Sequence, residues 1–129
     1  MMADQIFTYY HDLLTNRSIV DAHGCRLWTG GTHYCRRTRY GIVRAKLPGW
    51  KVSKPTGVHL LAYFISTKTC DIPKGLNVSH LCHNSLCINT LHLSLEPVAI
   101  NRMRQTCLGT IPRHCTGHLV YPDCILFDR

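Results

Sequence analysis

The sequence has no long hydrophobic run. No apolar stretch approaches the ~20 residues of a membrane-spanning helix, which argues against an integral membrane protein. The first residues also lack the basic segment and following apolar run of a secretory signal peptide. We therefore expect an intracellular protein, located in the nucleus.

Acidic residues are scarce as well. Asp and Glu total 7, against 15 Lys and Arg, and the formal net charge is +8. This excess favours a polyanionic partner, most simply a nucleic acid, without distinguishing DNA from RNA.

A chain of 129 residues, 45% of them hydrophobic, predicts one domain with a modest core. Such a core gains stability from metal cross-links. The 8 cysteines could form the disulfides of a secreted scaffold, but histidines are interleaved with them, which favours metal sites.

A first candidate metal site lies in the segment SHLCHNSLCINTLHLSLEPVAIN, residues 79–101, where Cys82, Cys87 and His92 follow one another in steps of five. Thiolates and an imidazole at such spacings suit a tetrahedral zinc ion, and a structural site is closed by four ligands. We expect Cys25, at the turn in HGCRLWTGG, as the fourth, with His23 as the alternative. Buried, inert thiols are the competing interpretation.

A second cluster follows in CLGTIPRHCTGHLVYPDC, residues 107–124. We expect Cys107, Cys115, His118 and Cys124 to bind a second zinc, because adjacent His114 and Cys115 rarely both reach one ion. His114 in place of His118, and a disulfide between two of these cysteines, are the alternatives.

Basic and apolar residues alternate between Tyr34 and Ser53, and LPGW at 47–50 indicates a chain reversal. This pattern predicts a twisted antiparallel ribbon able to enter a DNA major groove. Arg37 and Arg39 fall on one strand face and Arg44 on the other, so a bulge or turn near Gly41 would be needed to unite them. The candidate DNA-binding residues are Arg37, Arg39, Arg44, Lys46, Lys51 and Lys54. A solvated strand face is the alternative.

Other patterns predict the remaining elements. Residues 4–16 form a helix with Asp4 as N-cap and Ile6, Tyr10, Leu13 and Leu14 on one stripe. A core helix, with a structural His59, follows a Thr56 cap. Strands are expected at 76–81 and 91–95, and a helix from about 96 to 105, whose Arg102 and Arg104 could meet a nucleic-acid backbone.

The run SHLCHN, the cysteine five positions later, LHL at 91–93, Asn101 and the later Cys/His cluster resemble the His-Cys box homing endonucleases. These belong to the ββα-metal, or His-Me finger, nucleases. The resemblance implies an α+β fold: a small mixed domain with an antiparallel β ribbon, a ββα-metal core and two structural zinc sites. We expect a single domain over 1–129, in which 1–56 hold the first helix and the basic ribbon, 57–106 a helix and the ββα core, and 107–129 the second zinc region.

The resemblance also implies roles for individual residues. His80 would be the general base, Asn101 the protein ligand of one catalytic Mg²⁺, and an upstream arginine, with Arg44 preferred over Arg37 and Arg39, would lie near the scissile phosphate. The chemistry agrees, because a histidine can activate water and an amide oxygen suits Mg²⁺.

The expected function is Mg²⁺-dependent cleavage of double-stranded DNA, with homing-type site specificity and a homodimer implied by the resemblance. Family members of this type close their dimer with a longer tail, whereas here the chain stops five residues after Cys124. A non-specific or nicking nuclease, and a zinc-dependent DNA-binding module without catalysis, are the alternatives.

Overall fold

The computed structural model describes residues 2–126. Its helices are α1 (Ala3–Asn16), α2 (Val58–Thr67) and α3 (Val98–Gly109), with a 3-10 turn, η1 (Thr90–His92). Its strands are β1 (Ser18–Val20), β2 (Arg26–Trp28), β3 (Thr32–Cys35), β4 (Thr38–Ala45), β5 (Lys54–Gly57), β6 (Leu76–His80) and β7 (Leu93–Pro97). The expected small mixed fold with antiparallel strands is confirmed.

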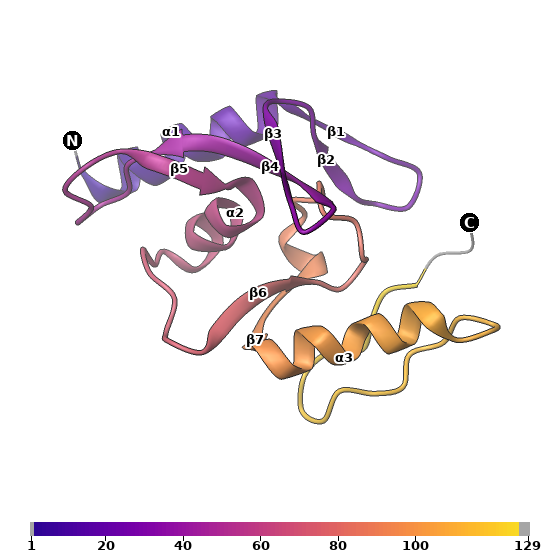
Figure 1. The fold of residues 1–129 in the computed structure, drawn as a ribbon. Coiled ribbons are helices and arrows are strands. Elements are labelled where there is room, and N and C mark those ends of the chain that lie inside the picture. Colours follow the sequence, from indigo (N-terminus) through magenta and orange to yellow (C-terminus); the bar gives the residue numbers. More distant parts are fainter. Residues whose placement is uncertain (1, 127–129) are drawn as a thin grey trace.

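The strands form three separate antiparallel sheets. β1 pairs with β2, β6 pairs with β7, and β3, β4 and β5 form a three-stranded sheet in that order. Figure 1 shows α1 along the three-stranded sheet, α2 between that sheet and the β6–β7 hairpin, and α3 at the opposite edge beside the C-terminal segment.

The hydrophobic core lies where α2 meets α1 and the three-stranded sheet. Val58, Leu61 and Phe64 of α2 are buried there with Trp28. Because α2 is apolar on most of its surface, it has to be covered from several directions. This core fills the half of the molecule away from α3.

The first helix buries nearly the predicted stripe. Leu14 is buried, and Ile6, Tyr10 and Leu13 are partly buried against the core. Phe7, which the stripe omitted, is buried as well. The Tyr10 hydroxyl accepts a hydrogen bond from the Lys46 backbone N–H at 2.8 Å, which ties α1 to the end of β4.

Both predicted helix caps are wrong. The N-cap of α1 is Met2 rather than Asp4, and its N–H donates to the Gln5 side chain at 3.0 Å. Thr56 lies in β5, and Gly57 precedes α2. In each case the chain takes up helical geometry one or two residues away from the side chain that local propensity favours.

The β6–β7 hairpin and α3 form the expected ββα unit. β6 ends at His80, and β7 starts at Leu93 rather than 91, because 90–92 form η1. The Asn89 side chain accepts a hydrogen bond from the Leu91 N–H and starts that turn. α3 begins at Val98 and runs to Gly109, so it starts about two residues later and ends four residues later than predicted.

The bulge expected near Gly41 is absent from the described pairing. β4 pairs with β3 from Thr38 to Gly41 and with β5 from Ile42 to Ala45 without an interruption in register. Arg37 also lies in the two-residue β3–β4 turn, at φ 68°, and not on a strand. The basic residues therefore do not form one strand face. Across residues 2–126, none of the helices combines the length and apolar character needed to span a bilayer.

Candidate metal centres and active-site groove

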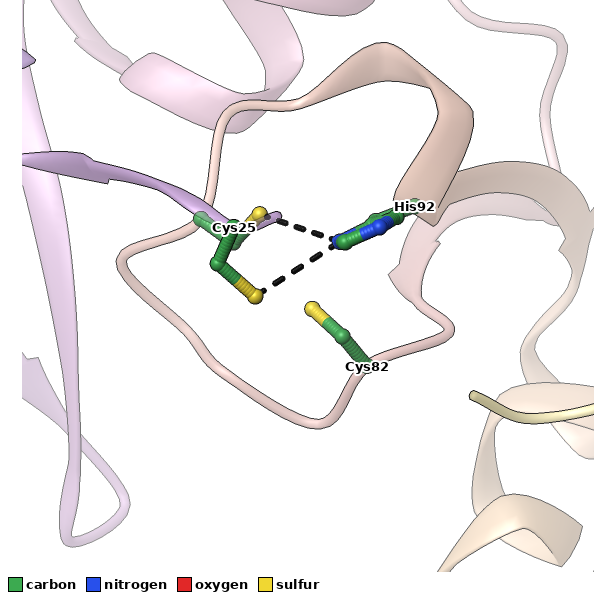
Figure 2. A group of neighbouring side chains, drawn as sticks. Cys25, Cys82 and His92 are labelled. Carbon is green, nitrogen blue, oxygen red and sulfur yellow. Dashed lines mark hydrogen bonds between the residues drawn. The ribbon is translucent and has the colours of Figure 1, made fainter. Parts of the chain in front are cut away.

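The first Cys/His cluster brings together Cys25, Cys82, Cys87 and His92, whose ligand atoms all lie within 4.8 Å of one another. All four residues are buried. In Figure 2 the sulfur atoms of Cys25 and Cys82 and the ring of His92 converge on one space. The structure thus places the predicted fourth residue, Cys25, beside the other three.

Cys25 reaches the cluster because the β1–β2 hairpin is bound to the 82–92 loop. The Asp21 carboxylate accepts hydrogen bonds from the His23 and Cys25 N–H groups, both at 2.9 Å, and shapes the turn. The Asn89 side chain donates to the Gly24 carbonyl at 2.8 Å. The hairpin therefore presents Cys25, and not His23, to the cluster.

The distances fit a tetrahedral zinc ion. With Zn–S near 2.3 Å and Zn–N near 2.0–2.1 Å, sulfur and nitrogen ligands of such an ion stand about 3.6 Å apart. His92 Nδ1 lies 3.5 Å from Cys25 Sγ and 3.6 Å from Cys87 Sγ. Buried thiols and an imidazole are also the donor set that zinc prefers. This cluster could hold zinc.

The thiols of this cluster influence one another. A hydrogen bond with Cys82 lowers the pKa of Cys87 to about 5. Burial, with the neighbouring charge of Cys87, raises the pKa of Cys25 to about 11. One thiolate is thus favoured, and a divalent cation would displace the remaining protons.

The second cluster consists of Cys107, Cys115, His118 and Cys124, again with ligand atoms within 4.8 Å of one another. His118 Nε2 lies 3.4 Å from Cys107 Sγ and 3.3 Å from Cys124 Sγ. Backbone N–H groups of Thr116 and Cys124 donate to Cys107 and Cys115 sulfurs at 3.3 and 3.2 Å. Such donors orient and stabilise zinc thiolates. This cluster too could hold zinc.

His114 and two of the cysteines lie outside the clusters. His114 is exposed, with Nδ1 3.2 Å from the Pro112 carbonyl, and is not part of the second cluster. Cys35 is exposed and Cys70 is partly buried, both as free thiols. The expected division of the 8 cysteines into three, three and two is thus what the structure shows.

His80 and Asn101 line one groove, with a volume of about 730 Å³. His80 stands at the end of β6, and Asn101 lies in the first turn of α3. Tyr40 of β4 and His59 of α2 line the same groove. The two residues that the resemblance singled out thus share one concave surface, although the 82–92 loop and β7 separate them in the chain.

The environment of His80 keeps its imidazole neutral. Its Nε2 lies 3.0 Å from the Cys87 backbone carbonyl, and since a carbonyl can only accept, Nε2 carries the hydrogen and Nδ1 keeps its lone pair. Burial, with His59 adding to it, lowers the pKa of His80 to about 3. The neutral imidazole has a fixed tautomer with Nδ1 available to accept a proton, while its low pKa makes it a weak base.

His59 is a groove residue that sequence reasoning assigned to structure alone. Its ring lies 4.7 Å from the His80 ring and 5.8 Å from the Tyr40 ring, measured between centroids. Burial lowers its pKa to about 4. The helical spacing of α2 gave no sign of this contact, because it depends on how α2 meets β6.

The arginines of the ribbon and of α3 differ in their surroundings. Arg44 is exposed on the β4 face that Tyr40 shares, does not line the groove, and donates to the Ser53 carbonyl at 3.1 Å. Arg104, expected to meet a nucleic acid, is instead 1% exposed and paired with Glu96. That expectation is wrong, because the guanidinium charge of Arg104 is neutralised by Glu96 inside the protein.

The fold and these clusters define a small ββα protein with two sites suited to zinc. Residues 49–126, more than half of the chain, match the family described as the zinc-binding loop region of homing endonucleases. The chain belongs to this family, and the expected resemblance is confirmed. Comparison with curated proteins and with solved structures found no match.

Proposed function

We propose that this chain is a Mg²⁺-dependent endonuclease that hydrolyses phosphodiester bonds of double-stranded DNA. Membership of the homing endonuclease family points to a nuclease acting on DNA. The observation that carries the proposal is the placement of His80 and Asn101 along one groove beside the first metal cluster. The net charge of +8 favours binding of the polyanionic substrate.

His80 is the general base. With Nε2–H donated to the Cys87 carbonyl, Nδ1 takes a proton from the attacking water, and the nucleophilic oxygen forms a bond to phosphorus as the bond to the 3′ or 5′ oxygen breaks. Because the imidazole is already neutral near pH 7, no proton has to be removed from it beforehand.

Asn101 is the protein ligand of the catalytic cation. A bound Mg²⁺ would supply the Lewis acid that neutralises charge on the leaving oxygen. An uncharged amide oxygen, partly exposed in the groove, fits a cation that keeps most of its waters and takes further oxygens from a phosphate. The role of Asn101 would be to hold that cation in the groove that His80 also lines.

The two clusters, each with three cysteines and one histidine, would hold structural zinc. The first would fix the loop between His80 and Asn101, and the second would bind the C-terminal segment to the end of α3. Homing-type recognition of a long site, the homodimer, the nuclear location and the assisting arginine remain predictions. Sedimentation equilibrium, with and without duplex DNA, tests the dimer.

The central experiment incubates the zinc-loaded protein with supercoiled plasmid and Mg²⁺. We expect the wild type to nick or linearise the plasmid. His80→Ala should slow cleavage by about 10²–10⁴, the usual contribution of a general base, and Asn101→Ala should be similarly impaired. Both variants should keep the zinc content and circular dichroism of the wild type.

Three outcomes would redirect the proposal. Cleavage by His80→Ala at the wild-type rate excludes His80 as the base. A wild type that binds duplex DNA without cutting it, at any Mg²⁺ concentration, supports the zinc-dependent binding module instead. Cleavage of plasmids irrespective of sequence would favour a non-specific nuclease.

A further inference from the structure

Arg104 is the largest of the side chains that are almost completely buried, with 1% of its surface exposed. Its Nε and Nη2 donate to the two carboxylate oxygens of Glu96 at 2.8 and 2.7 Å, and Glu96 itself is fully buried. This bidentate pair joins α3 to the last residues of β7. A buried arginine of this kind is costly to retain unless all of its donors are used.

The remaining donors of Arg104 reach the C-terminal segment. Nη2 donates to the Pro122 carbonyl at 2.9 Å, and Nη1 donates to Cys124 Sγ at 3.3 Å. Cys124 belongs to the second metal cluster. One guanidinium therefore connects α3 to β7, to the C-terminal segment and to a candidate zinc thiolate.

The same segment also bonds to the chain next to His80. The Ile125 N–H, next to Cys124, donates to the Leu81 carbonyl at 2.8 Å. Leu81 directly follows His80, and Ile125 packs against the first cluster. The C-terminal segment is thus bonded both to the chain beside His80 and, through Arg104, to the helix that carries Asn101.

Asn101 and Arg104 are three residues apart on α3, so they lie on adjacent turns of one helix face, and both line the groove. Any rotation of α3 that displaced Asn101 would break the fixed geometry of the Glu96–Arg104 pair. We propose that Arg104 is a positioning residue, which couples the second metal cluster to the placement of Asn101 in the groove that His80 also lines. This inference rests on the proposed function in that Asn101 is taken as the cation ligand.

The first test measures release of zinc from the full-length protein to a chromogenic chelator. Arg104→Lys keeps the charge but loses the paired donors, and Glu96→Gln keeps the volume but loses the charge. In both we expect one of the two zinc ions to leave about tenfold faster, as is usual when a residue that supports a metal ligand is changed. Arg102→Lys, exposed on the same helix, is the matched control and should release zinc as the wild type does.

The second test separates positioning from general stability. In Arg104→Lys, still loaded with zinc, the Mg²⁺ concentration for half-maximal plasmid nicking should rise about tenfold, while the rate at saturating Mg²⁺ changes less. A purely structural role would reduce the amount of active protein without moving this concentration. An unchanged Mg²⁺ dependence, or unchanged zinc release, overturns the inference.

Failure of the nuclease proposal can be told apart from failure of this one. If the wild type does not cut DNA, amide hydrogen exchange decides the coupling: removal of the faster-leaving zinc should deprotect residues 98–104 and the Ile125 N–H, which donates to the Leu81 carbonyl, in the wild type. Unchanged exchange there would overturn the coupling. If Arg104→Lys does not fold, Glu96→Gln is subjected to the same measurements and is decisive.

Discussion

The imidazole rings of His59 and His80 lie 4.7 Å apart between centroids, one from the first turn of α2 and the other from the end of β6. At this separation, and with both rings buried, protonation of either imidazole is unfavourable. Burial is the largest cause that lowers both pKa values, and for His80 the neighbouring His59 adds to it. This contact links the protonation of the candidate base to the packing of α2.

We predict that His80 stays neutral well below the ordinary range of histidine. Its pKa is about 3 in the folded protein, against 6.5 for an unperturbed group, and the imidazole Cε1–H chemical shift should not titrate between about pH 8 and pH 5.5. Zinc content should be checked at each pH, since acid also removes zinc. A titration midpoint near 6.5 would show that His80 is more solvated than the structure implies.

The same pair should make the fold sensitive to acid. Because the pKa values of His59 and His80 are about 4 and 3 in the folded state, below the value of 6.5 for the unfolded chain, the unfolded chain binds protons first as the pH falls. Their contribution to stability is fully present above pH 6.5 and is lost as the pH falls toward 4 and then 3. Urea unfolding as a function of pH would measure this loss, and His59→Leu should reduce it.

We predict two zinc ions per chain, one at each cluster. Cys87→Ser and Cys107→Ser each remove a completely buried thiol from a different cluster, and each should lose one zinc. Elemental analysis measures the stoichiometry. Cys35→Ser, at an exposed thiol outside both clusters, is the control and should keep both ions. Loss of zinc on Cys35→Ser would contradict the division of the cysteines.

Removal of zinc should also unfold much of the ββα half. That half is held by clusters, hairpins and the Glu96–Arg104 pair, whereas the buried aliphatic and aromatic residues lie mainly around α2. Metal binding is then part of the folding free energy. Circular dichroism after chelation should show loss of helix and strand signal, with recovery on addition of zinc. A chelated protein with an unchanged spectrum would show that the apolar core suffices.

Sequence reasoning grouped the cysteines and histidines of the two clusters as the structure does, because ligand chemistry and spacing are local. Cys82, Cys87 and His92 lie within one loop, and only the fourth residue, Cys25, had to be chosen from a distance. Sequence reasoning was less successful for side chains whose surroundings depend on tertiary packing. Neither the burial of Arg104 nor the contact of His59 with His80 leaves a trace in periodicity, since each depends on how separate elements meet.

The fold class and most elements were predicted, whereas caps and strand faces were not. Thr56 is a strong cap by propensity, but its hydroxyl bonds the Lys54 carbonyl inside β5. A bulge at Gly41 was expected only because the basic residues could not otherwise share one strand face, and nothing in the local sequence required it. Gly41 instead allows the side chains of Trp28 and Val58 to pack closely against β4.

We predict that Gly41→Ala destabilises the core. A Cβ at this position would lie 2.5 Å from Trp28 Cδ1 and 2.5 Å from Val58 Cγ2. Overpacking of this kind costs about 1–3 kcal/mol of unfolding free energy. Urea unfolding measures the change, and Gly109→Ala, where an added Cβ meets nothing within 4 Å, is the control. Equal stability of Gly41→Ala and the wild type would show that β4 can move away from α2.

We predict, last, that Arg44 contributes to DNA binding through charge. It is exposed on the face of β4 that Tyr40 shares beside the groove, and its partner in the protein is the neutral Ser53. Its charge is therefore not neutralised by a carboxylate in that contact.

If Arg44 contacts one phosphate, Arg44→Ala should weaken binding of duplex DNA and reduce the slope of log affinity against log salt by about 0.9. Fluorescence anisotropy with a labelled duplex, at several salt concentrations and without Mg²⁺, measures both. Arg17→Ala, an exposed change of the same type at the end of α1, controls for net charge alone. Equal losses of affinity and slope in the two variants would mean that position on the sheet is irrelevant and that only total charge matters.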